Sequence, residues 1–507
     1  MSNLILAYDL GTGGVKTSVF NEDGVSIAEC FAAYNTSYPS SGYHEQNPLD
    51  WWEAVVTSTK KVLANAGIKK DDIHCLGVSG HSLGIVPIAG DGSLLLNHVP
   101  IWSDSRAGKQ ADDFFSRTSA DEWYLATGNG FPAPLYAAFK IMWVKENLPE
   151  VYAKTDKFIG TKDYINFRMT GKLCTDYSYA SGSGVYSLND WKYIDSYIQA
   201  AGLLKAKFPE IVPSTQVIGT LLPSVAKELG LSEGTQVVSG GVDNACMALG
   251  AGCVEDGMAY TSMGSSAWIA VSGNTPILDL QYKPYVFTHC IPGMFVSSEA
   301  IFSAGSSFKW LRDALCRNFL GEKEPYDTMT ALAQTSPLGS NRLLFVPTLA
   351  GGSSLDKSPN IKGAFVGLQL GHTQADIIRS VMEGICLNLK IALDVMEKKL
   401  SVADEMLIVG GGGKSQFWRS LFADVYGKAI LETNVGQDAG SLGAAAVAGV
   451  GIGLWKDFKF VQKIHKEKGR IQPNLENHRK YQEILKLFEK VVSFQSDFGD
   501  WIESTKW

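Results

Sequence analysis

Two carboxylates stand beside glycine-rich turns in this 507-residue sequence. Asp9 comes just before the turn Gly11-Thr12-Gly13-Gly14, which Lys16 follows, and Asp243 follows a pair of glycines and precedes Asn244. A strand that turns on glycines offers backbone N–H groups to an anion, because no Cβ blocks the approach of phosphate oxygens. A carboxylate on such a loop is well placed to accept a proton, although an N-cap is its more frequent role in isolation. The pattern therefore predicts a phosphate-handling site with an acid–base group.

A second glycine-turned hairpin follows at an offset of 253 residues, half the chain length. Aligning Gly11 with Gly264 places Ser265 and Ser266 on the first turn, and Ser262 where the first copy carries Asp9. This similarity has two explanations: an internal duplication, or the general likeness of any two glycine-containing β-hairpins. Two such loops could hold a polyphosphate between them, whereas one alone most often marks only a tight turn.

Other phosphate and nucleophile motifs fit less well. The Walker pattern fails because its first glycine would fall on Ile408, and the Rossmann pattern breaks at Lys16. The run 80–84 matches G-x-S-x-G, which would make Ser82 a nucleophile, but that motif requires a following helix, and 85–89 is β-branched and contains proline. A serine hydrolase built on Ser82 stays as an alternative because His289 and His372 follow in the order that such triads use.

Apolar periodicity supplies the elements that would position these residues. Helices are expected at 51–64, 109–115, 162–169 and 375–398, and strands at 4–10, 15–20, 25–28, 75–79, 157–160, 235–239, 259–263, 267–271 and 406–409. Their alternation indicates an α/β class with mixed sheets. We place the boundary between two halves within 241–256, and we expect the charged stretch from about 456 to 507 to be helical.

The composition of the chain excludes some classes of binding partner and predicts the cell compartment. Lys and Arg number 45 against 52 Asp and Glu, a net charge of −7 without long runs of one sign, which argues against a nucleic-acid or anionic-membrane surface. The eight cysteines are scattered without a C-x-x-C pair, as in a reducing compartment. The amino terminus lacks a basic region and a long apolar segment, and the apolar run 444–455 is too short to span a bilayer. We expect a cytoplasmic protein.

Taken together, the motifs resemble those of the FGGY carbohydrate kinases, over residues 4 to about 453. The first phosphate loop, 9–16, is closest to the family's xylulokinase form, and the loop 241–245 matches the one that carries the catalytic aspartate. Further matches are 45–48, 101–106, 162–164, 140–147, the glycines 410–413 with 416–418, and the run 436–445. The most specific match is the carboxy-terminal signature: 363–368, seven residues, Asp376-Ile377, two residues, and 380–383.

The resemblance implies two actin-like domains, of the ribonuclease H-like and Hsp70 superfold, with a cleft between them. The division would be 1–246 for the sugar-binding domain, 247–455 for the ATP-binding domain, and 456–507 for a helical appendage. It also implies an ATP-dependent kinase of a small sugar that uses Mg²⁺, and a homodimer is common in the family.

Roles carry over from the resemblance residue by residue. Asp243 would be the general base, and Asp9 would bind Mg²⁺, which prefers carboxylate and phosphate oxygens. The polyphosphate would contact Gly11, Thr12, Gly13, Lys16, Gly264, Ser265 and Ser266. The adenosine would contact Gly411, Gly412 and Gln416. The sugar would contact His81, Ser82, Leu83, Trp102, Asp104 and Asn244.

The sugar-facing residues depart from the xylulokinase pattern. Xylulokinases usually carry Gln-Met-His where this chain has His81-Ser82-Leu83, and Gly-Glu-Arg-x-Pro where it has 351–355; the amino-terminal signature is only half kept, since Leu135 and Ala137 are off pattern. A ketopentose such as xylulose is the expected substrate, and another ketose, a polyol such as glycerol, or an aldonate such as gluconate is the alternative. A non-catalytic ATP-driven binding protein on the same superfold is a further alternative.

Overall fold

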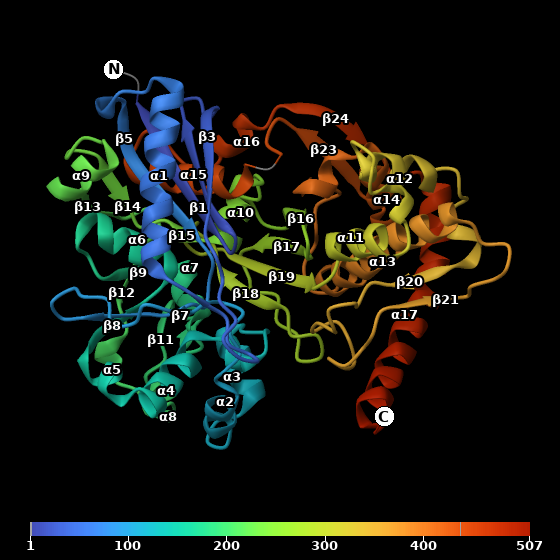
Figure 1. Ribbon diagram of the computed structural model, residues 1–507, viewed down its shortest axis with the longest axis horizontal. Coiled ribbons are helices and arrows are strands. Elements are labelled where there is room, and N and C mark those ends of the chain that lie inside the picture. Colours follow the sequence, from blue (N-terminus) through green and yellow to red (C-terminus); the bar gives the residue numbers. More distant parts are fainter. Residues whose placement is uncertain (1–2, 437, 507) are drawn as a thin grey trace. The chain divides into compact units, whose positions relative to one another are not determined.

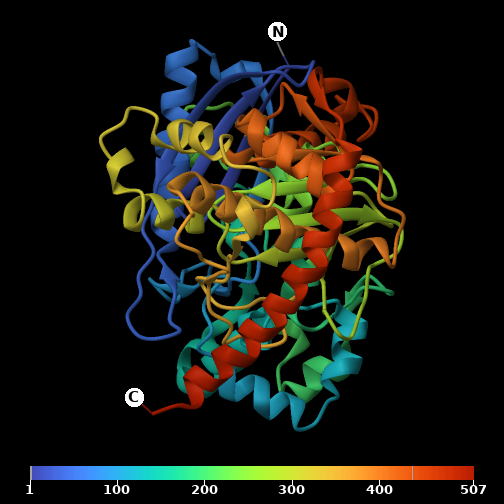
Figure 2. The same cartoon turned by 90° about the vertical axis from the view of Figure 1, so that its right-hand side faces the viewer.

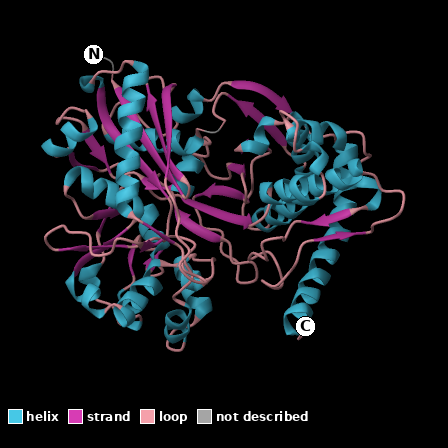
Figure 3. Cartoon of the chain, viewed as in Figure 1, coloured by secondary structure: helices cyan, strands magenta, loops and turns pink. Residues whose placement is uncertain are grey.

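The computed structural model describes residues 3–436 and 438–506. Gln437, part of the run 436–445, lies outside them. The chain forms two compact units (Figure 1). Unit 1 comprises Met1–Asp256, Ser272–Ser297 and Asp438–His465, and unit 2 comprises Gly257–Val271, Ser298–Gln437 and Lys466–Trp507. Helices alternate with strands in both units, as expected of an α/β protein (Figure 3).

The main sheet of unit 1 has the strand order β13-β14-β5-β1-β2-β3, and β15 also pairs with β5. The strands are β1 (Leu4–Gly11), β2 (Gly14–Phe20), β3 (Ser26–Ala33), β5 (Ile73–Gly80), β13 (Val217–Thr220), β14 (Gln236–Val238) and β15 (Gly241–Val242). β1 runs antiparallel to β2 and parallel to β5. The carboxyl ends of β1, β5 and β15 therefore meet at one edge of the sheet.

Two helices pack against the central strands of this sheet. α1 (Pro48–Ala66) contacts β2 and β3, and α15 (Ala439–Gly451) contacts β1 and β5. The side chain of Asn47 caps α1 by accepting a hydrogen bond from the backbone N–H of Leu49, and proline occupies the first helical position. β1 is buried along its length from Leu4 through Tyr8, so its side chains are covered on both faces of the sheet.

The remaining elements of unit 1 surround this core. The helices are α2 (Gly108–Phe115), α3 (Ala120–Thr127), α4 (Ala137–Asn147), α5 (Pro149–Lys154), α6 (Thr161–Thr170), α7 (Tyr177–Ala180), α8 (Asp195–Ala200), α9 (Pro223–Leu229), α10 (Asp243–Gly250) and α16 (Phe460–Ile464). The strands are β4 (Glu45–Gln46), β6 (Val86–Ala89), β7 (Val99–Pro100), β8 (Thr155–Ile159), β9 (Cys174–Asp176), β10 (Tyr186–Ser187), β11 (Lys192–Tyr193), β12 (Glu210–Val212) and β18 (Tyr285–Thr288).

Unit 2 contains the same three-strand arrangement as unit 1: an antiparallel hairpin whose first strand also has a parallel neighbour. Its strands follow the order β17-β16-β22-β23-β24, in which β16 (Ala259–Met263) is antiparallel to β17 (Ala267–Gly273) and parallel to β22 (Glu405–Val409). The other strands are β19 (Phe295–Ile301), β20 (Leu344–Val346), β21 (Ala364–Val366), β23 (Ala429–Thr433) and β24 (Glu467–Ile471). The helices are α11 (Gly305–Ala314), α12 (Pro325–Ala333), α13 (Gln374–Glu397), α14 (Gln416–Tyr426) and α17 (Leu475–Ser504). The two predicted hairpins thus have the same topology.

The predicted elements correspond to those observed, with one notable addition. The helix expected at 375–398 is α13, and those expected at 51–64 and 162–169 are α1 and α6. The stretch 456–507, which we expected to be helical, also contains β24, which pairs antiparallel with β23. β24 is short, charged and largely exposed at the edge of its sheet, so it lacks the apolar alternation by which strands are found in sequence.

No helix within the described ranges is both long and apolar enough to cross a membrane.

Candidate active site

The edge of the unit 1 sheet brings the two predicted carboxylates to opposite sides of strand β5. Asp9 on β1 stands opposite Lys16 on β2 and opposite Ser79 on β5. Val242, the residue before Asp243, stands opposite Gly80 on the other side of β5. Asp9 and Asp243 therefore flank the carboxyl end of β5, where ligands bind in open α/β sheets.

Helix α15 begins against the carboxylate of Asp9. A Cβ built on Gly440, in the first turn of α15, would stand 2.3 Å from Oδ2 of Asp9, so only glycine fits there without a shift. Further along the helix, a Cβ on Gly443 would stand 1.8 Å from the carbonyl oxygen of Cys246 on α10. These close approaches place the positive end of the α15 dipole beside Asp9.

Lys16 is held by two carboxylates. Its Nζ forms ion pairs with Asp438, just before α15, and with Glu29 on β3 at 2.9 Å. Burial alone would lower the pKa of Lys16, but hydrogen bonds and charge attraction from Asp438 and Glu29 outweigh it and raise the pKa. Lys16 is therefore a fixed cation at the base of the turn 11–14.

The turn 11–14 is anchored through its carbonyl groups. Tyr34 donates its hydroxyl to the carbonyl oxygen of Gly11 at 2.5 Å, and Gln46 Nε2 donates to the carbonyl oxygen of Thr12 at 2.7 Å. A Cβ on Gly14 would stand 2.5 Å from the carbonyl oxygen of Ala32, so glycine is needed where the turn re-enters β2. Gly11, Thr12 and Gly13 are exposed at the tip, as a phosphate loop requires.

Asp243 is the first residue of α10, and its side chain has a raised pKa. Burial, with a smaller contribution from the nearby Asp9 carboxylate, raises its pKa to about 7, against the opposing effect of a hydrogen bond donated by the backbone N–H of Asn244 at 2.8 Å. A carboxylate whose pKa lies near neutrality is matched to accept a proton from a hydroxyl group. Unit 1 thus combines this carboxyl group with the anchored turn 11–14.

The chemistry around Asp9 fits a divalent cation. Burial raises the pKa of Asp9, although the charge of Lys16 opposes the rise. Among the described residues, no group of three or more metal-ligating side chains occurs. A single carboxylate such as that of Asp9 is a usual kind of Mg²⁺ ligand, because this ion binds one or two carboxylates and completes its shell with water and phosphate oxygens.

The predicted sugar loop 81–83 follows β5 directly. The backbone N–H of His81 donates to the carbonyl oxygen of Leu10 at 3.1 Å, which ties the loop to the end of β1. His81 is buried, its pKa is lowered to about 4 by burial and by the charge of Lys140, and its ring is therefore neutral at physiological pH. Leu83 has a left-handed backbone, with φ of 60°.

Lys140, on α4, holds this loop to the next predicted sugar segment. Its Nζ donates hydrogen bonds to the carbonyl oxygens of Leu83 at 3.0 Å, Ile101 at 2.7 Å and Trp102 at 3.4 Å. Burial lowers the pKa of Lys140 to about 7, against the attraction of Asp104. Trp102 in turn donates its indole N–H to the hydroxyl oxygen of Thr12 at 2.9 Å. One buried ammonium thus fixes both segments beside the turn 11–14.

The carboxylate of Asp104 is bound by other residues of unit 1 rather than left free to contact a sugar. It is fully buried, it accepts the backbone N–H of His44 at 2.7 Å, and both of its oxygens accept hydrogen bonds from Arg106. Arg106 also forms an ion pair with Glu45 at 2.7 Å and lies over the ring of Tyr43. Both oxygens of Asp104 are therefore engaged within the protein, and its contact with a sugar stays a prediction.

The geometry around Ser82 is not that of a hydrolase. Strand β6, not a helix, follows the loop, and the left-handed residue is Leu83 rather than the serine. His289 accepts a hydrogen bond from the backbone N–H of Ile291 at Nδ1, and its Nε2 lies 3.2 Å from the carbonyl oxygen of Cys253. Both ring nitrogens of His289 are therefore engaged with the backbone, which leaves Ser82 without this histidine as a base.

The predicted phosphate loop of unit 2 is anchored by the start of α11. The carbonyl oxygen of Ser265 accepts the backbone N–H groups of Ala304 at 2.9 Å and Ser306 at 3.0 Å, and that of Gly264 accepts the N–H of Gly305 at 3.0 Å. Gly264 and Ser265 are exposed at the tip of the β16–β17 hairpin. The loop is thus held through its carbonyl groups, like its counterpart in unit 1.

The predicted adenosine loop lies beside this hairpin. β16 and β22 are parallel neighbours, so the glycines 410–413 that follow β22 leave the sheet at the same edge as Gly264. A Cβ on Gly412 would stand 2.3 Å from Cγ of Met263, the last residue of β16. Gln416 is exposed at the start of α14, which the Ser415 side chain caps. Unit 2 therefore gathers the predicted residues for one end of a nucleotide.

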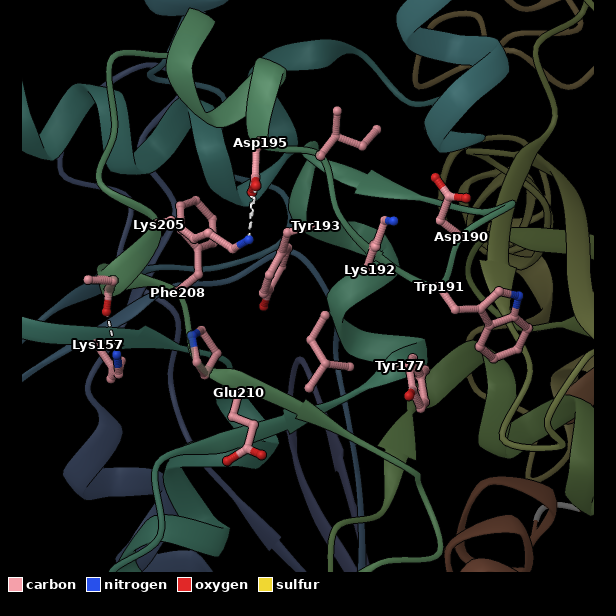
Figure 4. Close-up of a pocket in the computed structure, with 14 residues that line it drawn as sticks. Lys157, Tyr177, Asp190, Trp191, Lys192, Tyr193, Asp195, Lys205, Phe208 and Glu210 are labelled. Carbon is pink, nitrogen blue, oxygen red and sulfur yellow. Dashed lines mark hydrogen bonds and ion pairs between the residues drawn. The ribbon is translucent and has the colours of Figure 1, made fainter.

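A large cavity of unit 1 lies apart from these residues. It has a volume of about 1060 Å³, and aromatic side chains line it together with lysines and carboxylates (Figure 4). Trp191 and Tyr193 contribute from β11 and the residue before it, and Phe208 contributes from the segment before β12. An ion pair joins Lys205 to Asp195. The described residues that line it include none of the predicted site residues.

Sequence reasoning missed several residues that position the site. Gly440 and Asp438 lie in the run 436–445, which we had matched to the family without assigning roles to its members. Lys140 likewise begins the matched segment 140–147. Tyr34 had no signal in the sequence, because its contact with Gly11 depends on the pairing of β2 with β3.

Known proteins share this architecture and these motifs. The model for the N-terminal domain of the FGGY family of carbohydrate kinases matches residues 4–250, and that for its C-terminal domain matches 259–452. The chain is 28% identical to the xylulose kinase of Bacillus subtilis, over 99% of each chain. It is 30% identical to the xylulose kinase of Escherichia coli, over 88% of this chain and 89% of the other.

Solved structures agree in fold. The gluconate kinase of Lactobacillus acidophilus superposes with a TM-score of 0.90 at 26% identity, covering 99% of this chain and 100% of that one. The ligand-bound xylulose kinase of the same species superposes with a TM-score of 0.89 at 26% identity, covering 96% and 97%.

The chain has the two-domain α/β fold of these sugar kinases, which is the actin-like ATPase fold. The chain belongs to the FGGY family of carbohydrate kinases. It is therefore a sugar kinase that uses ATP, as the alignments across both domains indicate.

Proposed function

We propose that this kinase phosphorylates a primary hydroxyl of a ketopentose, with xylulose as the favoured substrate, and that Asp243 is the general base. The observation that carries the proposal is the carboxyl group of Asp243, whose pKa burial raises to about 7 at the start of α10, beside Asp9 and the turn 11–14. Xylulose kinases at 28–30% identity over nearly the whole chain support the choice of sugar.

In this proposal, Asp243 accepts the proton of the sugar hydroxyl as its oxygen forms a bond to the γ-phosphorus and the bond to the ADP oxygen breaks. Asn244 fixes one oxygen of Asp243 through its backbone N–H. The exposed turn 11–13 and Lys16 bind phosphate oxygens, and Gly264, Ser265 and Ser266 bind them from the second hairpin. Gly411, Gly412 and Gln416 line the adenosine.

Asp9 would hold Mg²⁺, which when bound neutralises charge on the transferring phosphoryl group. The sugar pocket would be shaped by His81, Ser82, Leu83, Trp102 and Asp104.

The predicted domain division belongs to the same proposal: residues 1–246 would bind the sugar, residues 247–455 would bind ATP, and residues 456–507 would form an appendage. The cytoplasmic location and a homodimer belong to the same proposal.

Gluconate is the second candidate substrate. The gluconate kinase that superposes with a TM-score of 0.90 favours it, as does the departure from the xylulokinase pattern at 81–83. A coupled assay of ADP release over pentuloses, hexuloses, polyols and gluconate separates the two. Xylulose should give the highest kcat/KM, and a gluconate kcat/KM that exceeds it by tenfold would replace the proposed substrate.

A further inference from the structure

Unit 1 buries an ion cluster beside the loop that leads to Asp243. Its members are Lys162 and Asp163 on α6 and Asp176 on β9, none of which is more than 1% exposed. The Nζ of Lys162 lies 2.6 Å from Oδ1 of Asp163 and 3.0 Å from Oδ1 of Asp176. In Figure 1 the labels of α6, α7, β9 and β15 lie near the lower end of the blue strands, and Figure 2 shows this teal and green part of unit 1 after a turn of 90°.

Lys162 holds the start of the loop 239–242, which ends directly before Asp243. Its Nζ donates a further hydrogen bond to the carbonyl oxygen of Ser239 at 3.1 Å, and Asn166, one turn further along α6, donates to the same oxygen at 2.7 Å. An ammonium group has three N–H donors, so Lys162 has one for each of its three acceptors. The first residue of the loop is therefore fixed to α6 by two donors.

Asp176 holds the end of the loop through Ser178 on α7. The hydroxyl of Ser178 donates to Oδ2 of Asp176 at 2.5 Å and accepts the backbone N–H of Val242 at 2.9 Å. The same carboxylate oxygen accepts the backbone N–H of Ser178 at 2.9 Å and the hydroxyl of Ser214 at 2.7 Å. Val242 directly precedes Asp243, so Asp176 reaches that residue through one hydroxyl group and one peptide group.

The middle of the loop consists of two glycines in close quarters. Gly240 has a left-handed backbone with φ of 76°, and a Cβ there would stand 2.0 Å from the carbonyl oxygen of Val78 on β5. A Cβ on Gly241 would stand 2.4 Å from Sγ of Cys290. Glycine has more conformational freedom to lose than any other residue. Groups outside the loop must therefore fix its course.

We propose that Lys162, Asp176 and Ser178 are positioning residues, which hold the loop 239–242 so that the carboxyl group of Asp243 meets the sugar hydroxyl. The inference rests on the proposed role of Asp243 as the general base. A general base must lie within hydrogen-bonding distance of the proton that it accepts. Such a group keeps its geometry only when packing and hydrogen bonds hold its support. Hydrogen bonds to ionised groups, as in this cluster, are roughly twice as strong as neutral ones.

The hydroxyl of Ser178 is the link that can be removed alone. Ser178→Ala leaves the N–H of Val242 without this acceptor and keeps all three charges of the cluster. We expect kcat to fall about tenfold, because small displacements of a catalytic group are costly. KM for the sugar and for ATP should stay within about twofold, since the turn 11–14 and the loop 81–83 have anchors of their own.

Ser181→Ala is the matched control. Ser181 is as buried as Ser178 and lies three residues later, and its hydroxyl accepts the backbone N–H of Thr288 at 3.3 Å instead. The same substitution therefore removes an acceptor of the same kind from a strand that does not carry Asp243. This variant should keep kcat within about twofold of the wild type. A loss as large as that of Ser178→Ala would overturn the proposal.

A double-mutant cycle with Asp243→Asn separates positioning from general stability. If Ser178 acts through the carboxyl group of Asp243, Ser178→Ala should lower kcat about tenfold in the wild type and less than about twofold in Asp243→Asn. Losses of equal size in the two backgrounds, or no loss in the wild type, would overturn the proposal. The general base fails separately, if Asp243→Asn alone keeps the turnover of the wild type.

Asn166→Ala tests the other end of the loop, and its result does not depend on the folding of Ser178→Ala. The variant removes one hydrogen bond to the carbonyl oxygen of Ser239 and keeps Lys162 with both carboxylates. We expect kcat to fall about threefold in the wild type and to stay unchanged in Asp243→Asn, since a neutral hydrogen bond is the weaker of the two. Thermal melting shows that each variant is folded at the assay temperature. A threefold loss in both backgrounds, or in neither, would contradict the proposed positioning.

Discussion

Gly440 lies so close to Asp9 that a methyl group at position 440 would stand 2.3 Å from the Asp9 carboxylate oxygen Oδ2. The residues are separated by more than 400 positions in the chain, yet both belong to unit 1, because the segment 438–465 returns to the first sheet. The segment supplies the helix that covers Asp9, as well as Asp438, the partner of Lys16. The carboxy-terminal part of the chain therefore completes the site of the amino-terminal part.

Gly440→Ala should displace either Asp9 or α15. We expect kcat to fall at least tenfold, because a shift of about 1 Å at a catalytic centre can cost 10²-fold. Steady-state kinetics and thermal melting measure the two effects. Gly90→Ala is the control, because a Cβ there would meet no atom within 4 Å. Wild-type kcat in Gly440→Ala would show that the close approach does not position Asp9.

The pH profile should report Asp243. Its raised pKa of about 7 means that the base is protonated below neutrality, so kcat/KM should fall tenfold per pH unit below about 7 and level off above it.

The contribution of Asp243 to folding stability changes with pH in the opposite direction. The folded state binds more protons than the unfolded state between about pH 4 and 7, so Asp243 contributes a loss of stability as pH rises through that window.

Asp243→Asn should therefore raise the melting temperature at pH 8 more than at pH 5. Differential scanning calorimetry at the two pH values measures this difference. Equal shifts at both values, together with a flat kcat/KM profile in the wild type, would contradict the raised pKa.

Lys140→Met should disturb the sugar pocket and spare the nucleotide. The ammonium holds the carbonyl oxygens of Leu83 and Ile101, and hydrogen bonds from a charged donor contribute about 1.5–3 kcal/mol. We expect KM for the sugar to rise about tenfold to a hundredfold while KM for ATP changes less than twofold. Lys145→Met on the same helix, which removes a bond to the carbonyl of Gly202, is the control. Equal rises in both KM values would indicate general unfolding instead.

Metal removal should abolish the activity reversibly. A chelator should stop ADP release, and added Mg²⁺ should restore it in the wild type. Asp9→Asn should stay inactive at any Mg²⁺ concentration, because the variant lacks the carboxylate at the end of β1. Glu29→Gln, at the exposed partner of Lys16, should keep most of its activity. Rescue of Asp9→Asn by excess Mg²⁺ would contradict the metal assignment.

Much of this architecture could be predicted from the sequence. The turn 11–14 and the loop 264–266 lie where glycine and strand-like runs indicate, because local backbone requirements leave a direct trace in residue type. The hydrolase motif at Ser82 could also be discounted from the strand that follows it. These inferences depend only on neighbours within a few residues.

The relationships that the sequence did not reveal are long-range. Nothing near Gly440 indicates that its missing side chain makes room for Asp9, and Lys140 resembles any helical lysine until its three carbonyl partners are known. Asp104 was expected to face the sugar, yet Arg106, two residues later, engages both of its oxygens. Burial and pairing of this kind follow from the tertiary fold.

The most direct test compares phosphorylation of xylulose by the wild type and by Asp243→Asn under saturating Mg-ATP, with sugar phosphate and ADP both quantified. The wild type should form one sugar phosphate per ADP, and the variant should turn over at least 10²-fold more slowly while its nucleotide affinity stays within about twofold. Turnover of Asp243→Asn close to that of the wild type would contradict the account.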